Sequence, residues 1–374
     1  MPMTTAAPPT PHGLRALCAA DLPPDALVPA LLEALHGVVP SSRNLFDWTD
    51  DDGRLLRYHI EGPIDLVIAR LYFDEFHNRR ETEAMLPFQA LRDRPAGVYG
   101  TEALDRPGFH ETALYHEIWK PQGMHTRLEA VLRGRGGRLL GSLVLYRAPG
   151  EAAFTADERQ RLARLLPMLS RALDTSAADA VRAASPDEPH VPAPGPAETL
   201  LIDPDGRPCH ASAGAWQLLL MADGGASPAA LDRMPQQPGG PLLRALQAQL
   251  ARWPDAPAQV QHDNGAGRFV ASGRRLAALP GTPGPHVVLV TLRRHEPRRV
   301  ALERALRGLP LTPGQAAVCR ALYDGQAQAQ IAQALGVAPS TVVDHVRKAY
   351  RALDVHCAFE LRALLDKRIA SAAA

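Results

Sequence analysis

Residues 311–355 read LTPGQAAVCRALYDGQAQAQIAQALGVAPSTVVDHVRKAYRALDV, and this stretch decides the fold of the carboxy-terminal part of the chain. Thr312 stands before a proline and three residues before Gln315, which is the pattern of a capping box with proline at the first helical position. Gly325 ends this first helix. Gly336 ends a second one, because glycine adopts a left-handed turn at little cost.

A third helix is predicted over 339–353, and its residue spacing gives it two different faces. Three- and four-residue spacing places the apolar residues on one side: Val342, Val346, Ala349, Tyr350 and Leu353. The other side carries Ser340, Asp344, Arg347, Lys348 and Arg351. With a fourth helix at about 358–369, the pattern predicts an all-α, four-helix helix-turn-helix domain over 309–370, with residues 297–308 as a connecting helix.

Several features of this stretch match one family in register: the opening LTP, the glycine after the first helix, I-A-x-x-L, S-T-V-x-x-H-V and a closing leucine. Over about 311–365 the chain resembles LuxR-type transcriptional regulators. The resemblance implies that the third helix is the recognition helix and that Val343, Asp344 and Arg347 meet bases. It implies phosphate contacts from Gln328, Ser340, Thr341, Lys348 and Arg351. The expected function is therefore sequence-specific regulation of transcription.

The stretch departs from the family at two positions. The family often has lysine or arginine where Val343 stands, and serine or threonine where Ala338 precedes the recognition helix. Val343 could contact a thymine methyl, Asp344 could accept a hydrogen bond from cytosine N4, and Arg347 is the candidate for guanine. The missing cap at Ala338 should cost about 1 kcal/mol.

The front of the chain is divided by a segment poor in large apolar residues, 174–198, whose five prolines exclude a helix and favour extended backbone. Before it, residues 24–173 predict an α+β sensor domain: helices at 24–39, 64–76 and 154–173, and strands at 43–48, 54–60, 127–133 and 139–147. Thr155 and Glu158 predict a capping box on the last helix.

The end of this segment, GSLVLYRAPGEAAFTADERQRLARLLPMLSRAL (141–173), resembles the last strand and final helix of GAF domains. Residues 199–296 resemble a smaller PAS-like α+β domain. Here the sequence predicts a hairpin at 199–211, helices at 213–221 and 242–253, and strands at 268–279 and 286–294. No internal repeat is evident.

Most aromatic residues lie before Thr175 and could line a pocket for an apolar effector or fill an ordinary core. The candidates for a ligand site are Tyr72, Phe76, Tyr99, Phe109, Tyr115 and Trp119. His110, His116 and His125 match no common metal-ligand spacing, so neither a metal nor another cofactor is expected. The sequence also lacks a phosphate-binding loop and a nucleophile elbow, so we expect no enzyme.

Composition sets the remaining expectations. A net charge of +1 requires DNA binding to come from a local basic surface, and four scattered cysteines fit a reducing cytoplasm. No apolar run is long enough to cross a bilayer. The expected partners are double-stranded DNA, a second copy of the chain, an unidentified small-molecule effector and RNA polymerase. The alternative is a small-molecule-binding or enzymatic front half whose carboxy-terminal helices act as a protein-interaction module.

Overall fold

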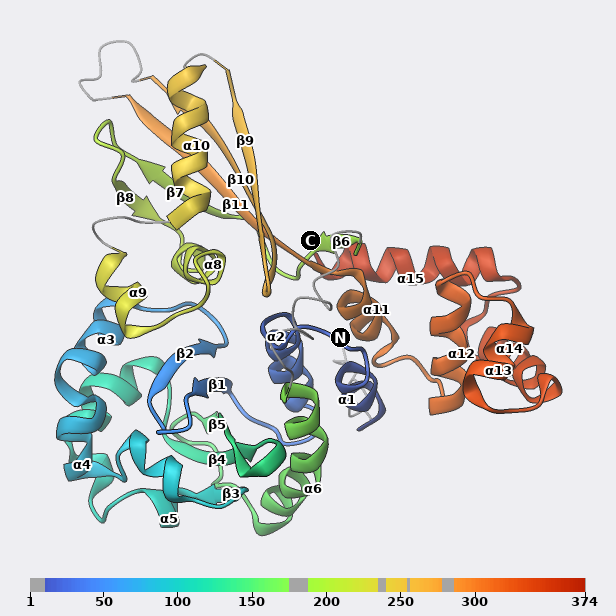
Figure 1. Ribbon diagram of the computed structural model, residues 1–374, viewed down its shortest axis with the longest axis horizontal. Coiled ribbons are helices and arrows are strands. Elements are labelled where there is room, and N and C mark those ends of the chain that lie inside the picture. Colours follow the sequence, from blue (N-terminus) through green and yellow to red (C-terminus); the bar gives the residue numbers. More distant parts are fainter. Residues whose placement is uncertain (1–10, 175–187, 235–239, 254–255, 278–285, 374) are drawn as a thin grey trace.

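The computed structural model describes residues 11–174, 188–234, 240–253, 256–277 and 286–373 (Figure 1). It has an α+β amino-terminal region with two antiparallel sheets and a helical carboxy-terminal region, which confirms the predicted fold class at this level. Within the described residues, no helix combines the length and the apolar character that a membrane span needs.

The first sheet has the strand order β2-β1-β5-β4-β3. Its strands are β1 (Arg43–Thr49), β2 (Leu55–Ile60), β3 (Gly97–Gly100), β4 (Thr126–Arg133) and β5 (Leu139–Arg147). Asp47 of β1 pairs with both Tyr58 of β2 and Ser142 of β5, while Glu129 of β4 pairs with Val144 of β5. Because side chains alternate along a strand, this register sets one face of the sheet, to which these residues belong.

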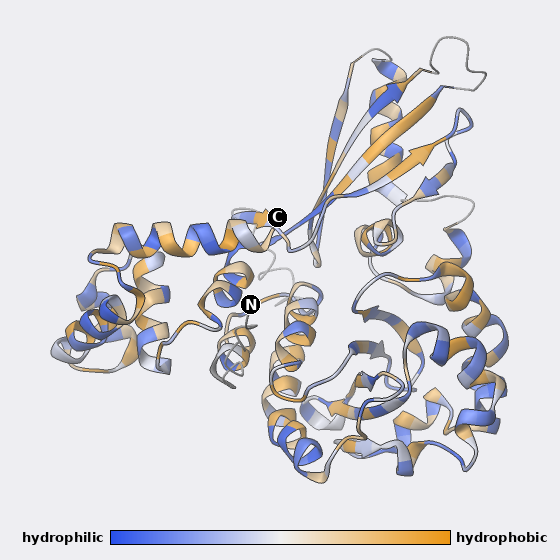
Figure 2. Cartoon of the chain, turned by 180° about the vertical axis from the view of Figure 1, so that it is seen from behind, coloured by the Kyte–Doolittle hydropathy of each residue, from blue (hydrophilic) through white to orange (hydrophobic). Residues whose placement is uncertain are grey.

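The opposite face of the first sheet is covered by three helices: α1 (Pro11–Cys18), α2 (Pro24–Leu35) and α6 (Ala156–Leu173). Helix α2 is hydrophobic along most of its length, as Figure 2 shows, and its leucines are buried. Thr155 and Glu158 form the predicted capping box at the start of α6. The sequence analysis did not predict α1, a short helix that packs on α2 and α6.

The face that carries Asp47 is covered by short helical turns. They are α3 (Leu66–Leu71), η1 (Tyr72–Arg80), α4 (Glu81–Ala84), η2 (Phe88–Asp93), α5 (Thr101–Leu104), η3 (Phe109–Glu111), η4 (Leu114–Trp119) and η5 (Lys120–Gln122). The helical segment predicted over 64–76 is present from Leu66, as α3 followed by η1, and its helical backbone stops before His77 and Asn78. The chain widens into π-type turns after Leu71 and reverses at Asn78, which has a positive φ. The Glu81 carboxylate accepts hydrogen bonds from the Asn78 and Phe88 backbone nitrogens and so holds this reversal.

The second sheet has the order β8-β7-β11-β10-β9, with β6 added beside β11. Its strands are β6 (His190–Pro192), β7 (Glu198–Ile202), β8 (Pro208–Ala211), β9 (Ala258–Asn264), β10 (Gly267–Leu276) and β11 (Val287–Pro297). The helices of this part are α8 (Ala215–Ala222), α9 (Pro228–Arg233) and α10 (Gly240–Arg252). The sequence analysis missed β9, because its residues AQVQHDN are mostly polar, and also missed α9.

Two predictions for this region fall partly outside the described residues. Residues 175–187 of the predicted linker and the last two residues of the strand predicted over 268–279 are not described. The rest of the linker is extended, as predicted, and β6 within it pairs with the end of β11. This part of the segment therefore belongs to the second sheet.

The two sheets follow the same path. In each, a hairpin is followed by helices, and three further strands then return so that the last strand lies beside the first: β1 pairs with β5, and β7 with β11. Each unit then ends in a helix, α6 in the first and α11 (Arg298–Leu306) in the second. The repeated topology has no counterpart in a visible sequence repeat.

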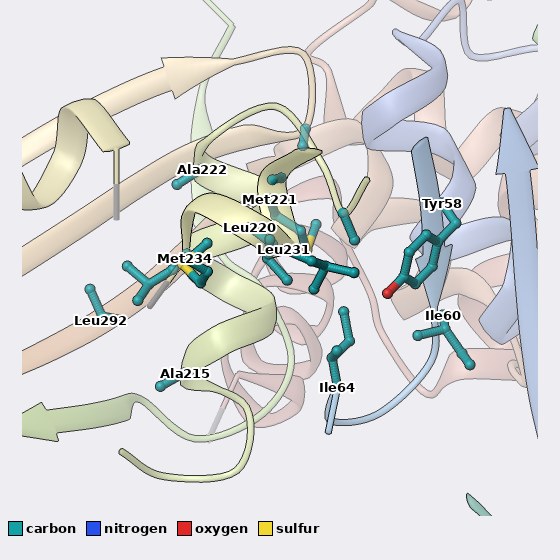
Figure 3. Close-up of a cluster of buried hydrophobic side chains, with 14 of the residues drawn as sticks. Tyr58, Ile60, Ile64, Ala215, Leu220, Met221, Ala222, Leu231, Met234 and Leu292 are labelled. Carbon is teal, nitrogen blue, oxygen red and sulfur yellow. The ribbon is translucent and has the colours of Figure 1, made fainter. Parts of the chain in front are cut away.

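The first and second units share a continuous apolar core, which Figure 3 shows in close-up. Tyr58, Ile60 and Ile64 of the first unit face Leu220 and Leu231 of the second. The backbone nitrogen of Tyr58 donates to the Ala226 carbonyl at 2.8 Å, so the second unit continues the edge of the first sheet. The second unit therefore covers the edge strand β2 at Tyr58 and Ile60, while Leu56 stays exposed.

Candidate nucleic-acid interface and sensor cavity

The carboxy-terminal helices form a small domain around their own apolar core. They are α12 (Pro313–Tyr323), α13 (Gln328–Leu335), α14 (Pro339–Leu353) and α15 (Ala358–Ala372). Thr312 accepts from the Gln315 backbone nitrogen and the Gln315 side chain accepts from that of Thr312, so the predicted capping box is present. Gly336 ends α13 with φ +66°, as its position predicted.

Helix α14 has one buried and one exposed face. Val342, Val346 and Ala349 are buried against α12 and α13. Each residue predicted to contact DNA lies on exposed or half-buried surface: Gln328, Ser340, Thr341, Val343, Asp344, Arg347, Lys348 and Arg351. This domain lies at the end of the molecule farthest from the first sheet (Figure 1).

Charged side chains on this face are already paired with one another. The Asp344 carboxylate accepts from Arg347 at 2.8 Å and contacts the Lys348 ammonium at 2.7 Å. These hydrogen bonds from Lys348 and Arg347 lower the pKa of Asp344. Beside this cluster Val343 is 53 % exposed, which is high for an apolar side chain. Arg347 therefore has its orientation set by Asp344 before any partner arrives.

A cavity of about 120 Å³ lies between the first sheet and the helical turns that cover it. Its walls are largely apolar and aromatic, with Tyr72, Phe73, Trp119 and Tyr146 among them. Its floor is polar, because Asp47, Arg127 and Glu129 project from the sheet face defined above. All three are buried.

The charged groups at this floor differ in how they are paired: Arg127 has two carboxylate partners, whereas Asp47 has no cation beside it within the described residues. Arg127 is bound by two carboxylates, Asp105 at 2.8 Å and Glu129 at 3.3 Å, and its guanidinium lies over the Trp119 ring. Asp47 has a hydrogen bond from the Ser142 hydroxyl at 3.2 Å. Burial, and then the nearby negative charge of Glu129, raise the pKa of Asp47 well above its usual value.

The six residues predicted to bind a ligand separate into two groups. Tyr72 and Trp119 line the cavity. Phe76 and Phe109 are fully covered in the core, Tyr115 is buried and bonded to His125, and Tyr99 donates to the Pro95 carbonyl near the surface. None of these four lines the cavity.

Of the three histidines considered for a metal, His110 and His116 are exposed and His125 is half-buried. His110 and His125 stack at 4.2 Å between ring centroids, and Tyr115 contacts His125 at 2.8 Å. Across the described ranges, no cluster of three or more His, Cys, Asp or Glu side chains is arranged to hold a metal ion.

Sequence reasoning missed the polar floor. Asp47, Arg127 and Glu129 stand at alternate positions in strands whose other residues pack against α2 and α6. Alternating charge in a strand is normally read as a face turned to water. Here the turns of residues 66–122 cover that face, so the same pattern marks the lining of a cavity.

Helix α11 joins the three parts of the molecule. It continues β11 without a loop, its Val300 is buried among α1 and α2, and its Ala301, Leu302, Ala305 and Leu306 enter the core of the carboxy-terminal domain. Arg304 pairs with Glu33 of α2 at 2.8 Å and with the buried Glu296 of β11. Helix α11 therefore contacts the first unit, the second unit and the carboxy-terminal domain.

The solved structures that match the chain are distant from it in sequence and superpose on it poorly. A Vibrio cholerae VqmA–ligand–DNA complex is 16 % identical, with 47 % of this chain and 84 % of that chain covered and a TM-score of 0.24. A phage VqmA–DPO complex is 16 % identical, covering 46 % and 84 %, with a TM-score of 0.18. The Escherichia coli DhaR(N)–DhaL complex is 12 % identical, covering 75 % and 86 %, with a TM-score of 0.24.

No curated protein sequence matches the chain. A family model described as "Bacterial regulatory proteins, luxR family" matches residues 309–363, which span α12, α13, α14 and the start of α15. The carboxy-terminal domain of this chain is thus a LuxR-family regulatory domain.

Proposed function

We propose that the protein is a sequence-specific, DNA-binding transcriptional regulator, not an enzyme, in which α14 enters the major groove. The exposed face of α14, with Arg347, Lys348 and Arg351 on a LuxR-family helix-turn-helix, carries this proposal. An α-helix with its side chains is about 10–12 Å wide and the major groove about 12 Å. The helix therefore fits the groove with its apolar side still packed on α12 and α13.

The electrostatics of α14 favour the same function. Three cations against the one carboxylate of Asp344 leave a local positive surface on a chain whose overall net charge is only +1. Phosphate neutralisation supplies much of the affinity of DNA-binding proteins, while base edges supply specificity. Val343 and Arg347 are the side chains we assign to base edges.

The front of the chain acts, in this proposal, as a sensor in which the first unit is GAF-like and the second PAS-like. The first unit holds the cavity, and Tyr58 lies both in the cavity wall and in the core shared with the second unit. A ligand that displaces Tyr58 would therefore shift α8 and α9, and through β11 and α11 the DNA-binding domain. We further propose a homodimer, because one recognition helix covers only one half-site.

The test is DNA binding by the full-length chain. A pool of random duplexes is first enriched on the protein, and affinity for the selected duplex is then measured by gel shift at several salt concentrations. Arg347→Ala with Lys348→Ala should abolish specific binding. The salt slope of the remaining non-specific binding should fall by about 1, because the phosphate contact of Lys348 is lost.

The matched control removes two positive charges elsewhere. Arg274 and Arg275 are exposed at the far end of β10, so Arg274→Ala with Arg275→Ala leaves α14 unchanged. This variant should bind like the original chain. Equal affinity of both double variants for the selected duplex would refute the proposal.

A further inference from the structure

We propose that the cavity of the first unit binds a small organic cation, a protonated amine carried on a single ring or a body of similar size, with Asp47 as its counter-ion. This inference names the effector class of the sensor, and so rests on the proposed function.

The charge balance of the buried cluster is the first argument. The cavity lining carries the buried carboxyl groups of Asp47 and Glu129, and Glu81 and Asp105 lie close to these two. A third lining carboxyl group, that of Asp65, is exposed and accepts from the Val67 and Ile68 backbone nitrogens. The cavity lining supplies one guanidinium to meet them, that of Arg127, which is already bound by Asp105 and Glu129. Burying negative charge without a counter-charge is costly, so this site favours a positive guest over an anion.

Asp47 is the buried carboxyl group of the cavity lining that has no cation partner among the described residues, and it is therefore the one available to a cationic ligand. It is only 8 % exposed and lines the cavity, yet its hydrogen bond from Ser142 occupies Oδ2 alone. No residue within the described part of the chain donates to Asp47 Oδ1. Glu81, by contrast, accepts from Asn78, Phe88 and Tyr72. Because Asp47 lines the cavity, its Oδ1 is open to a donor there, and a ligand N–H would supply that hydrogen bond.

The shape and the walls of the cavity limit the body of the ligand. An engineered apolar cavity of roughly 150 Å³ holds benzene, so a cavity of about 120 Å³ limits the enclosed part of the ligand to one small ring at most. Tyr72, Phe73 and Tyr146 present aromatic surface, which packs against apolar groups and also attracts cations. The neighbouring His77 does not compete for the role of Asp47, because burial lowers the pKa of His77 to about 4 and keeps its ring neutral.

A purely structural role for Asp47 would be better filled by a neutral residue. The carboxyl is buried and the negative Glu129 and Glu81 are close, so its ionised form is disfavoured. Asparagine has the same shape and could still accept the Ser142 hydrogen bond. A residue that destabilises the fold where a neutral one would not is typical of a binding site, because function often requires groups that lower stability.

The experiment compares three probes of equal size on the full-length chain: benzylamine as the cation, benzyl alcohol as the neutral isostere and benzoate as the anion. Binding is measured by calorimetry and by the shift in melting temperature. Benzylamine should bind about tenfold or more tightly than benzyl alcohol, since charge-assisted hydrogen bonds are about twice as strong as neutral ones. Benzoate should not bind.

The decisive variant is Asp47→Asn, and the matched control is Asp51→Asn, which changes an exposed carboxyl in the turn after β1. Asp47→Asn should melt at the same or a higher temperature and lose the preference for benzylamine, while Asp51→Asn keeps it. Three results would each overturn the proposal: no binding of benzylamine at millimolar concentration, equal binding of the amine and the alcohol, or an unchanged preference in Asp47→Asn.

This outcome is independent of the proposed DNA-binding function. The gel shift with the selected duplex is carried out without any of the three probes. The chain can therefore prove to bind DNA but not benzylamine, or benzylamine but not DNA. If both succeed, benzylamine should change the affinity for the duplex in the original chain and not in Asp47→Asn.

Discussion

A single acidic residue, Asp344, controls how the recognition helix presents its cations. It lies one turn before both Arg347 and Lys348 and pairs with each. In the groove the same carboxylate is repelled by phosphates and accepts only from a base donor such as cytosine N4. If α14 binds DNA as we propose, Asp344 should lower affinity for DNA in general and favour particular sequences.

We predict that Asp344→Asn raises affinity for non-specific duplex and steepens its salt dependence by about one unit of slope, because one negative charge is removed and two cations are released. Discrimination between the selected duplex and a scrambled one should fall. Gel shifts with both duplexes over a salt series measure this. A variant that binds scrambled DNA no better than the original chain would contradict the assigned role.

At the scale of the element, the recognition helix lacks a side-chain cap. Ala338 has the extended backbone of an N-cap residue but no oxygen to accept a hydrogen bond, as the sequence predicted. The neighbouring helix α12, by contrast, has a side-chain cap, because Thr312 and Gln315 form a capping box at its first turn. The two helices thus differ in how firmly their first turns are held.

We predict that Ala338→Ser stabilises the first turn of α14 by about 1 kcal/mol, since a serine hydroxyl would accept from a free backbone N–H there. Hydrogen exchange of peptides within 339–353 measures the local change. The control is Ala363→Ser on the exposed side of α15, which should be slightly destabilising because serine is a poorer helix former than alanine. Exchange as fast as in the original chain would mean that the first turn is held by other contacts.

At the scale of the whole molecule, Arg304 ties the three parts together. Its guanidinium reaches Glu33 in the first unit and Glu296 in the second, and it is carried by the helix that leads into the DNA-binding domain. Glu296 is 1 % exposed and so depends on this partner.

We predict that Arg304→Met destabilises the chain by about 3–5 kcal/mol, because it removes the hydrogen-bonded cation of the buried Glu296 carboxylate and leaves only the more distant Arg294 and Arg307. Adding Glu296→Gln should recover most of the loss. Urea unfolding followed by tryptophan fluorescence is suitable, since all four tryptophans lie in the two front units. If the double variant is no more stable than Arg304→Met, the buried charge is not the cause.

The sequence alone determined the carboxy-terminal domain. The capping box at Thr312, the left-handed Gly336 and the two faces of α14 all depend on residues within a few positions of one another, so local physics predicts them. The hairpin of β1 and β2 and the capped helix α6 were predictable for the same reason. Helix α1 was missed because it is short and gains its stability from packing on α2, α6 and α11.

Only the tertiary structure decided what the front of the chain holds. Whether Asp47, Arg127 and Glu129 face water or a cavity depends on distant turns that fold over the sheet, and no local pattern encodes that burial. The common path of the two sheets is likewise invisible in sequence, because topology constrains only which positions are apolar. The LuxR-type stretch at 311–355 therefore identifies the domain that we propose binds DNA, and the folded chain supplies the cavity that we propose controls it.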